Sequence, residues 1–580
     1  QPTKVAPAVH ISVQPTKEIV VPLCKQLPAP PTGAVSQAQG ERYCKLIADA
    51  HPTLFDGKQG TFKGVVAKIH LKEGAESKMK VLPPAKGKPK GVEIQAKIEK
   101  QLDKFYETAT IVDGIGLKVA SQMVPVIKKK NGEFNVRLCA NYKNTINPLI
   151  EDEPYNFPNI NEQCEKLMGE YYTCLDITNA YPHIKMEEES KQYMTVVTDR
   201  GFAQPDRLHF GIKTAPKIFQ SNIDKCLHGI PSCACIVDDI CVTGKTPAEH
   251  FQNVEAVLHR LEQAGLKLNP AKCRFYVKEV KYLGRIISKN GQKMDPEVVS
   301  AISKMPTPKS CKELESFLGF LSYVRRHVPD MSRVTPILSA LLKKDVKFIW
   351  KVEHEEAFQR CKRLAGNMAT LGHFDETKEI VLTTDASPVG LGACLSHRIV
   401  EGNKSYLQPI AYASRSLTSA EMNYAQIERE GLAVVWAVKY FRQYLYCRHF
   451  TLQTDCSALI KIFGPKNDLG GCAIGRMSRW CVDLMEYEFT AVHINGDKNK
   501  VCDGLSRLPQ PSPDNLLIND SGSGLPGRTT AEFANLTVAD TPTSIVQCLS
   551  ALPVSGRDAI SCCKARISTL RSACAAPDSH

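Results

Sequence analysis

The chain has 580 residues and carries 74 lysines and arginines against 61 aspartates and glutamates, a formal net charge of +13. This length exceeds what a single hydrophobic core supports, so three or four folded units are expected. The positive charge favours an anionic partner such as a nucleic acid, although solvated lysines alone could account for it. No apolar run reaches about eighteen residues, so no membrane-spanning helix is expected.

The 22 cysteines could indicate disulfides or zinc sites. They are scattered singly apart from Cys233/Cys235 and Cys562/Cys563, and no paired Cys-x-x-Cys with histidines occurs. Residues 1–23 lack the continuous apolar stretch of a signal peptide. We therefore expect free thiols in a reducing, intracellular compartment.

Composition and periodicity predict an α+β multidomain chain. Its segments are a linker or truncated upstream segment (1–45), a lysine-dense lead-in (46–109), short β-rich runs alternating with helices (110–290), a helical stretch (291–375), a second α/β unit (376–508) and a tail (509–580). A helix is expected near Val92–Thr108 in the lead-in. The Ser, Thr, Pro, Gly and Ala of the tail predict disorder.

The first cluster of acidic residues lies in the third segment. The run from Tyr171 ends in a carboxylate, which predicts a strand ending at Asp176. Apolar residues flank Asp238 and Asp239, which predicts a β-hairpin with both acids at its tip, although such a pair alone is more often an exposed turn. Neighbouring carboxylates repel each other, and a divalent cation removes that cost. Two Mg²⁺ ions about 3.5–4 Å apart can drive phosphoryl transfer.

Several motifs accompany these acids in one order: Leu175-Asp176-x-x-x-Ala180-Tyr181, Phe210-Gly211-x-x-x-Ala215-Pro216-x-x-Phe219-Gln220, Val237-Asp238-Asp239, Asn269-x-x-Lys272-Cys273 and Tyr282-Leu283-Gly284. The ordered set resembles the palm of the reverse transcriptases of gypsy-like LTR retrotransposons. Upstream, Val126-Ile-Lys-Lys-Lys-Asn-Gly132 and Arg137-Leu-Cys-Ala-Asn-Tyr142 resemble the fingers. The resemblance implies a right-hand polymerase, with fingers and palm over 110–290 and thumb and connection over 291–375.

The resemblance also implies a role for each matched residue. Asp176, Asp238 and Asp239 would be the catalytic metal ligands. The substrate contacts would be Tyr181 under the sugar, where it selects deoxynucleotides, Phe210 and Gly211 around the nucleotide, Lys129 and Arg137 on the triphosphate, and Lys272 as a proton donor to pyrophosphate. Without the resemblance, the lysine run around Lys129 would indicate only a hairpin with solvated side chains.

A second cluster of acids lies in the fifth segment. Apolar runs end at Asp385 and at Asp455, and a long helix expected over Ser419–Tyr444 carries Glu430. Asp503 would open a last helix, where it could equally be an N-cap. Acids on four different elements can converge on one site, where two cations drive water-mediated phosphodiester cleavage.

These acids also occur within ordered motifs: Thr384-Asp385-Ala-Ser, Gly390-x-Gly, Ser414-Arg-x-Leu, Asn423-Tyr, Glu428-x-Glu430, Trp436-Ala, Thr454-Asp455, Arg479-Trp480 and Asp503-x-Leu-Ser-Arg507. Together they resemble the ribonuclease H of the same elements. The resemblance implies that the metals are held by Asp385, Glu430, Asp455 and Asp503, with Glu428 as the alternative to Glu430. The run Phe317–His327 resembles the thumb and connection, where Arg325 and Arg326 would contact phosphates.

A few positions depart from the family pattern. Ile236 replaces a usual aromatic residue, Asn141 a usual aspartate and His209 a usual proline. None of these removes a metal ligand, so changed efficiency or fidelity is expected rather than inactivity. In the ribonuclease H motif, Cys456 replaces a usual histidine.

The expected function is therefore that of a bifunctional enzyme. An RNA-directed DNA polymerase (a nucleotidyltransferase) would copy retroelement RNA into DNA, and a linked ribonuclease H endonuclease would degrade the RNA strand of RNA–DNA hybrids. The implied cofactor is Mg²⁺, two ions per active site, with Mn²⁺ as a substitute. The implied partners are an RNA template, a DNA primer, an RNA–DNA hybrid and dNTPs, with no membrane and with the oligomeric state open. The implied location is a cytoplasmic virus-like particle, with nuclear entry left open.

The alternative is a decayed or co-opted retroelement-derived protein that binds nucleic acid without catalysis. All seven candidate metal ligands are present, which argues against it, since neutral drift would break some of them. A telomerase-like or other cellular polymerase is disfavoured by the second acidic cluster. Neither protease nor integrase motifs are recognised, and the completeness of the reading frame stays open.

Overall fold

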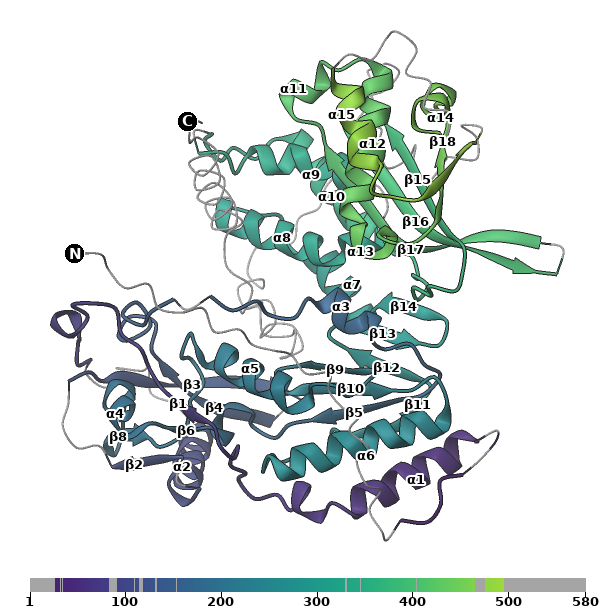
Figure 1. The fold of residues 1–580 in the computed structure, drawn as a ribbon. Helices are drawn as coiled ribbons and strands as arrows, with labels where there is room; N and C mark the ends of the chain where they lie inside the picture. The colour runs from purple at the N-terminus through teal and green to yellow at the C-terminus, as the bar shows by residue number, and fades with distance from the viewer. Residues whose placement is uncertain are drawn as a thin grey trace, which may run out of the picture. The chain divides into compact units, whose positions relative to one another are not determined.

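A computed structural model (Figure 1) describes residues 27–31, 33, 35–82, 91–108, 110–113, 118–130, 133–152, 154–328, 331–344, 346–402, 404–464 and 475–494. The chain divides into two compact units. The first comprises Gln1–Phe157 and Gly169–Lys278, and the second comprises Pro158–Met168 and Glu279–His580. Each unit has hydrophobic core residues of its own.

The first unit contains a four-stranded antiparallel sheet that carries the first acidic cluster. In spatial order its strands are β11 (Arg274–Val277), β5 (Tyr172–Asp176), β10 (Asp239–Thr243) and β9 (Cys233–Ile236). The helices packed with this sheet are α1 (Gln37–Asp49), α5 (Ala215–Leu227) and α6 (Pro247–Gln263), visible around it in Figure 1. Their apolar residues, including Phe219, Ile223 and Leu258, join the sheet in one core.

A second sheet of the first unit has five strands. Their order is β2 (Ile111–Asp113), β8 (Gly201–Pro205), β7 (Val196–Thr198), β3 (Ser121–Lys130) and β4 (Glu133–Asn141). Helix α2 (Val92–Glu107) packs on β4, which confirms the helix predicted near Val92–Thr108. The first unit also contains the parallel strand pair β1 (Val66–Ala67) and β6 (Lys185–Met186), and the short helix α4 (Glu188–Lys191) follows β6.

The second unit contains a helical part. A three-stranded sheet of β12 (Glu279–Tyr282), β13 (Arg285–Ser288) and β14 (Gly291–Met294) is followed by α7 (Pro296–Lys304), α8 (Cys311–Val324), α9 (Met331–Ala340) and α10 (Val352–Gly366). The short α3 (Ile160–Glu165) also belongs to this unit. Leu314, Phe317 and Leu321 of α8 are buried, which confirms the helical spacing seen in the sequence.

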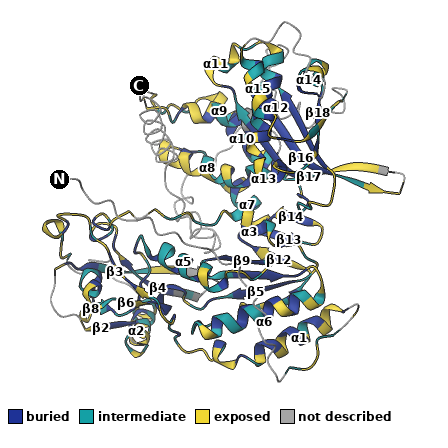
Figure 2. Ribbon diagram, viewed as in Figure 1, coloured by how far each residue is buried: buried dark blue, intermediate teal, exposed yellow. Residues whose placement is uncertain are grey.

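The rest of the second unit is a five-stranded mixed sheet with helices. Its order is β17 (Lys404–Ser416), β16 (Gly390–Glu401), β15 (Ile380–Ala386), β18 (Phe450–Thr454) and β19 (Phe489–His493). Strands β15, β16 and β17 are antiparallel, while β18 and β19 run parallel to β15. The helices are α11 (Ser419–Met422), α12 (Gln426–Tyr440), α13 (Arg442–Leu445), α14 (Ser457–Phe463) and α15 (Arg476–Leu484). Figure 2 shows the central strands buried.

The single helix predicted over Ser419–Tyr444 is wrong, because the structure divides it into α11, α12 and α13. Ala425 has an extended backbone with ψ 156°, and its N–H donates to the carboxylate of Glu428 at 3.1 Å. This side-chain cap starts a new helix, since it satisfies an N–H that a continuous helix would have used internally.

The described residues bear on two of the predictions, the state of the cysteines and the absence of a membrane-spanning helix. Every cysteine described there is a free thiol, as expected. Among the described residues, no helix combines the length and the apolar character needed to cross a bilayer.

Candidate active sites

The first acidic cluster forms at the end of the four-stranded sheet. Strand β5 ends at Asp176 and β10 begins at Asp239, and these two residues are direct cross-strand partners. The carbonyl of Asp238 accepts from the Ile177 N–H at 2.9 Å, which holds the hairpin tip against the end of β5. The predicted strand and hairpin are therefore confirmed, and the three acids occupy neighbouring backbone positions.

The electrostatics of this cluster favour a cation. Burial raises the pKa of Asp238 and of Asp239, and the negative charge of Asp176 adds to both rises. The Lys272 ammonium lies 2.9 Å and 3.1 Å from the two carboxylate oxygens of Asp176. The raised pKa values show that the surroundings lack the positive charge that would keep both carboxylates ionised. A divalent cation would supply that charge, and the donor set of carboxylate oxygens fits Mg²⁺.

The hairpin tip has an unusual backbone. Val237 has φ +54°, a conformation that costs a residue other than glycine about 1–3 kcal/mol. Its N–H donates to Oε1 of Gln220 on α5 at 2.7 Å. Gln220 appeared in the sequence only as part of a motif, and no role was predicted for it. Its signal was weak because the contact joins a helical side chain to a backbone N–H 17 residues further on, a relation that no residue spacing marks.

The residues predicted to surround the nucleotide lie close to one another. Tyr181 is buried, and its ring centroid is 5.1 Å from that of Phe210 in an edge-on arrangement. Gly211 has φ +99°, and a Cβ on it would lie 2.4 Å from the carbonyl oxygen of Ala140 on β4. Gly211 therefore has a conformational reason to be glycine, in addition to the nucleotide contact that we predicted.

The two predicted triphosphate contacts lie on the β3–β4 hairpin. Arg137 is exposed and pairs with Val126 across the ladder, and its positive charge partly offsets the rise that burial causes in the pKa of Asp238. Lys129 is opposite Phe134 in the same ladder. The side chain of Lys129 lies outside the described residues, so its contact stays a prediction.

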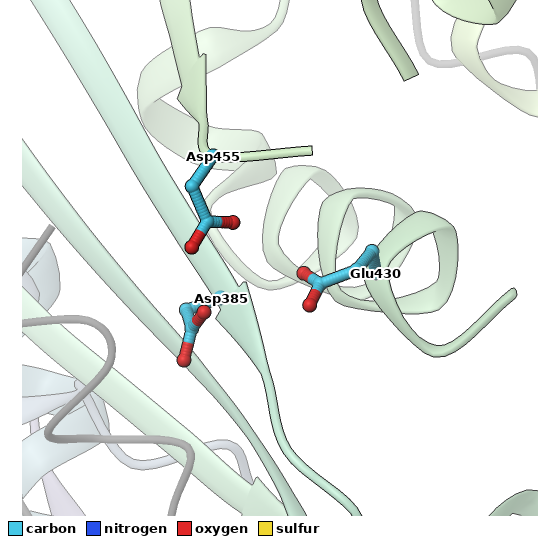
Figure 3. A group of neighbouring side chains, drawn as sticks. All are labelled: Asp385, Glu430 and Asp455. Atoms are coloured by element: carbon cyan, nitrogen blue, oxygen red, sulfur yellow. The ribbon is translucent and has the colours of Figure 1, made fainter. Parts of the chain in front are cut away.

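The second acidic cluster forms within the five-stranded sheet of the second unit (Figure 3). Asp385 lies near the end of β15, Asp455 follows β18, and Glu430 points towards them from α12. Each offers a carboxylate oxygen, and these oxygens all lie within 4.8 Å of one another. Three of the four predicted acids are thus brought together, while Asp503 lies outside the described residues.

Glu430 and Glu428 differ in their contacts. Burial raises the pKa of Glu430 to about 8, and the charges of Asp385 and Asp455 contribute to the rise. Glu428 instead accepts from the Arg476 guanidinium at 2.6 Å and caps the start of α12. The geometry therefore favours Glu430 as the ligand, and this trio of oxygen donors fits a divalent cation.

The phosphate contacts predicted for Arg325 and Arg326 do not match the structure. The Arg326 side chain is only 12% exposed and donates to the Glu165 carboxylate at 2.9 Å and to the Tyr444 hydroxyl. The Arg325 guanidinium donates to the carbonyl of Ser414. Both guanidinium groups hydrogen-bond to residues of the second unit itself, because a charged group that is buried needs a polar partner.

The fold and the two acid clusters define a right-hand polymerase joined to a ribonuclease H-like domain. Residues 127–287 match the reverse transcriptase (RNA-dependent DNA polymerase) family, and residues 375–487 match the RNase H-like domain found in reverse transcriptase. Over these two regions the chain is similar to the retrovirus-related Pol polyproteins of transposons.

Three curated relatives illustrate this. The Pol polyprotein from transposon 297 of Drosophila melanogaster is 35% identical over 390 residues, which are 67% of this chain and 36% of the relative. That from transposon opus of the same species is 33% identical over 441 residues, 73% of this chain and 43% of the relative. The Tf2-3 polyprotein of Schizosaccharomyces pombe is 32% identical over 405 residues, which are 68% of this chain and 30% of the relative. The matched part of the chain spans 30–43% of the length of these relatives.

Solved structures support the same fold. The foamy viral protease-reverse transcriptase in complex with dsDNA has a TM-score of 0.62 at 19% identity, covering 80% of this chain and 94% of that one. The same viral protein in complex with an RNA/DNA hybrid has a TM-score of 0.59 at 18% identity. This match covers 85% of this chain and 64% of the viral chain. At these identities the likeness concerns the fold alone.

Proposed function

We propose that the chain is an RNA-directed DNA polymerase with a linked ribonuclease H. The observation that carries the proposal is the presence of two separate acid clusters, each in the family region that would need it. The first would extend a DNA primer on an RNA template with dNTPs. The second would cleave the RNA strand of the resulting hybrid.

Each residue of the polymerase site would have a distinct task. Asp176, Asp238 and Asp239 would hold two Mg²⁺ ions, which when bound activate the attacking hydroxyl and stabilise the leaving oxygen. Tyr181 would lie under the sugar, Phe210 and Gly211 would shape the nucleotide pocket, and Lys129 and Arg137 would bind the triphosphate. Lys272 would remain beside Asp176 until a cation competes for that carboxylate, and it would then be available to the pyrophosphate.

In the nuclease site, Asp385, Glu430 and Asp455 would hold the cations, with Asp503 as the fourth ligand. Mn²⁺ would substitute for Mg²⁺, because it accepts the same oxygen donors. Glu430 must lose its proton before it can bind a cation, so its raised pKa makes cation affinity increase with pH up to about 8.

The test is a pair of assays on the full chain. Primer extension on poly(rA)/oligo(dT) and cleavage of a labelled RNA–DNA hybrid are measured with Mg²⁺, with Mn²⁺ and with a chelator. Both activities are expected with either cation and neither with the chelator. If the folded protein bound the hybrid but performed neither reaction, the alternative of a non-catalytic nucleic-acid-binding protein would replace the proposal.

A further inference from the structure

Three polar side chains connect helix α5 to the tip of the β9–β10 hairpin. Gln220 is fully buried, and its Oε1 accepts from the Val237 N–H at 2.7 Å. Its Nε2 donates to the Cys235 carbonyl at 3.1 Å and to Oδ1 of Asp224 at 2.8 Å. The other carboxylate oxygen of Asp224 accepts from the Tyr155 hydroxyl at 2.7 Å. All of these residues belong to the first unit.

The chemistry of the three groups determines which way the amide of Gln220 points. Gln220 and Asp224 are four residues apart on α5, so their side chains lie on one face of the helix. An ionised carboxylate only accepts hydrogen bonds, so Asp224 must face the NH₂ end of the amide. The oxygen of Gln220 is thereby directed at the hairpin, and Tyr155 holds the carboxylate from its far side.

The hairpin tip needs this oxygen. Val237 is β-branched and has φ +54°, a region such residues seldom adopt. A polar N–H that is removed from water requires an acceptor, and Gln220 supplies one. The carbonyl of the next residue, Asp238, accepts from the Ile177 N–H, which follows β5, at 2.9 Å. The tip is thus clamped between α5 and the end of β5.

We propose that Tyr155, Asp224 and Gln220 form a positioning chain that sets the polymerase carboxylates for cation binding. The proposal rests on the proposed function, because it assigns Asp238 and Asp239 to the cations. Without these three side chains, the Val237 amide loses its acceptor and the hairpin tip can leave its strained conformation. Asp238 and Asp239 then lose their fixed positions, and more Mg²⁺ is needed to reach the same activity.

The experiment compares four variants with the wild-type full chain. Gln220→Leu removes both ends of the amide. Gln220→Glu keeps an acceptor for Val237 but places two carboxylates side by side. The double variant Gln220→Glu/Asp224→Asn restores the links from Tyr155 through position 224 to position 220 and the Val237 N–H, because an Asn amide donates to Glu and still accepts from Tyr155. It does not restore the donation to the Cys235 carbonyl, so recovery is expected to be partial. Asn222→Ala is the matched control, since Asn222 lies on α5 and donates to the Ile218 carbonyl of its own helix.

Two readouts separate positioning from folding. Hydrogen exchange of the Val237 amide should become about tenfold faster in Gln220→Leu and Gln220→Glu, the effect of losing about one hydrogen bond. The Mg²⁺ concentration for half-maximal primer extension should rise about tenfold in the same variants, with hybrid cleavage by the second unit unchanged. The double variant should recover both properties towards wild type, and Asn222→Ala should resemble wild type throughout.

The outcomes are distinguishable from failure of the proposed function. Wild-type protein that extends no primer contradicts the proposed function, while the exchange of the Val237 amide still decides whether Gln220 holds the tip. Wild-type exchange and Mg²⁺ dependence in both Gln220 variants would overturn the positioning chain. A double variant no better than Gln220→Glu would overturn the part of the chain that runs through Asp224.

Discussion

Glu428 and Glu430 lie two residues apart on α12 and face different partners. The carboxylate of Glu430 is buried within 4.8 Å of those of Asp385 and Asp455, while Glu428 pairs with Arg476 at 2.6 Å. Residues two apart on an α-helix point in nearly opposite directions, so one helix turn cannot present both acids to one site. Glu430 is therefore the candidate metal ligand, whereas Glu428 caps the start of α12 and pairs with Arg476.

The pair supplies a matched test of the nuclease site. Glu430→Gln is expected to reduce hybrid cleavage at least about 100-fold, because it removes a ligand and not merely a residue that supports one. Glu428→Gln should change cleavage less than about fivefold, since a partly exposed ion pair contributes about 1 kcal/mol or less. Cleavage of a labelled hybrid by both variants checks this. Equal losses in both would contradict the assignment of Glu430.

The raised pKa of Glu430 predicts how stability depends on pH. Folding raises this pKa from 4.5 to about 8, so the folded state binds the proton more tightly. The stabilisation by this proton is complete below pH 4.5 and is lost as pH rises to about 8. Glu430→Gln should therefore stabilise the metal-free protein at pH 8.5 by up to about 5 kcal/mol, at about 1.4 kcal/mol per unit of pKa.

Thermal unfolding of the nuclease domain at pH 5 and pH 8.5 provides the measurement. Glu428→Gln controls for replacing an acid on the same helix. Added Mg²⁺ should stabilise wild-type protein more at pH 8.5 than at pH 5, because the cation needs the deprotonated carboxylate. A stabilisation by Glu430→Gln that was the same at both pH values would contradict this account.

Gly211 provides a test of the nucleotide pocket. Gly211→Ala introduces a Cβ 2.4 Å from the Ala140 carbonyl oxygen at φ +99°, so β4 must shift. The free energy of unfolding should fall by more than about 2 kcal/mol, and KM for dNTP should rise. Gly229→Ala is the control, because Gly229 also has positive φ, +81°, but open space around it. Equal destabilisation by the two would show that the close approach to Ala140 is unimportant.

Tyr181 is expected to select deoxynucleotides. Its ring is buried against Phe210 and Phe219, which limits the space beside it. Tyr181→Val should increase the relative use of ribonucleotides by about 100-fold, the discrimination that a shaped pocket achieves against an added hydroxyl. Tyr181→Phe keeps the ring and should keep the selectivity. The ratio of kcat/KM for dNTP and rNTP is the measurement, and an unchanged ratio in Tyr181→Val would refute this role.

Local patterns were sufficient to predict the strand ends that carry Asp176, Asp385 and Asp455. Apolar runs that stop at an acid identify such strand ends without any tertiary information. The division of the helix predicted over Ser419–Tyr444 was missed, because nothing in its periodicity marks the break at Ala425. That break depends on a hydrogen bond to Glu428, a residue that the motifs had suggested as a metal ligand.

Side-chain contacts that form only when the elements pack account for the other differences. Arg326 pairs with Glu165, 161 positions away, so a run of two arginines could suggest a phosphate contact but not an internal partner. Gln220 contacts Val237 through a side chain whose direction depends on Asp224 and Tyr155. Neither partner can be identified from spacing, because the pairing arises only when the elements pack.

The most direct test of the central claim measures both activities on the same preparations of wild type, Asp238→Asn and Glu430→Gln. Wild type should extend a primer and cleave the hybrid. Asp238→Asn should lose extension at least about 100-fold and retain cleavage, and Glu430→Gln should do the reverse, because each removes one ligand from one site. Loss of both activities together in either folded variant, or extension unaffected by Asp238→Asn, would contradict two separate acid-based active sites.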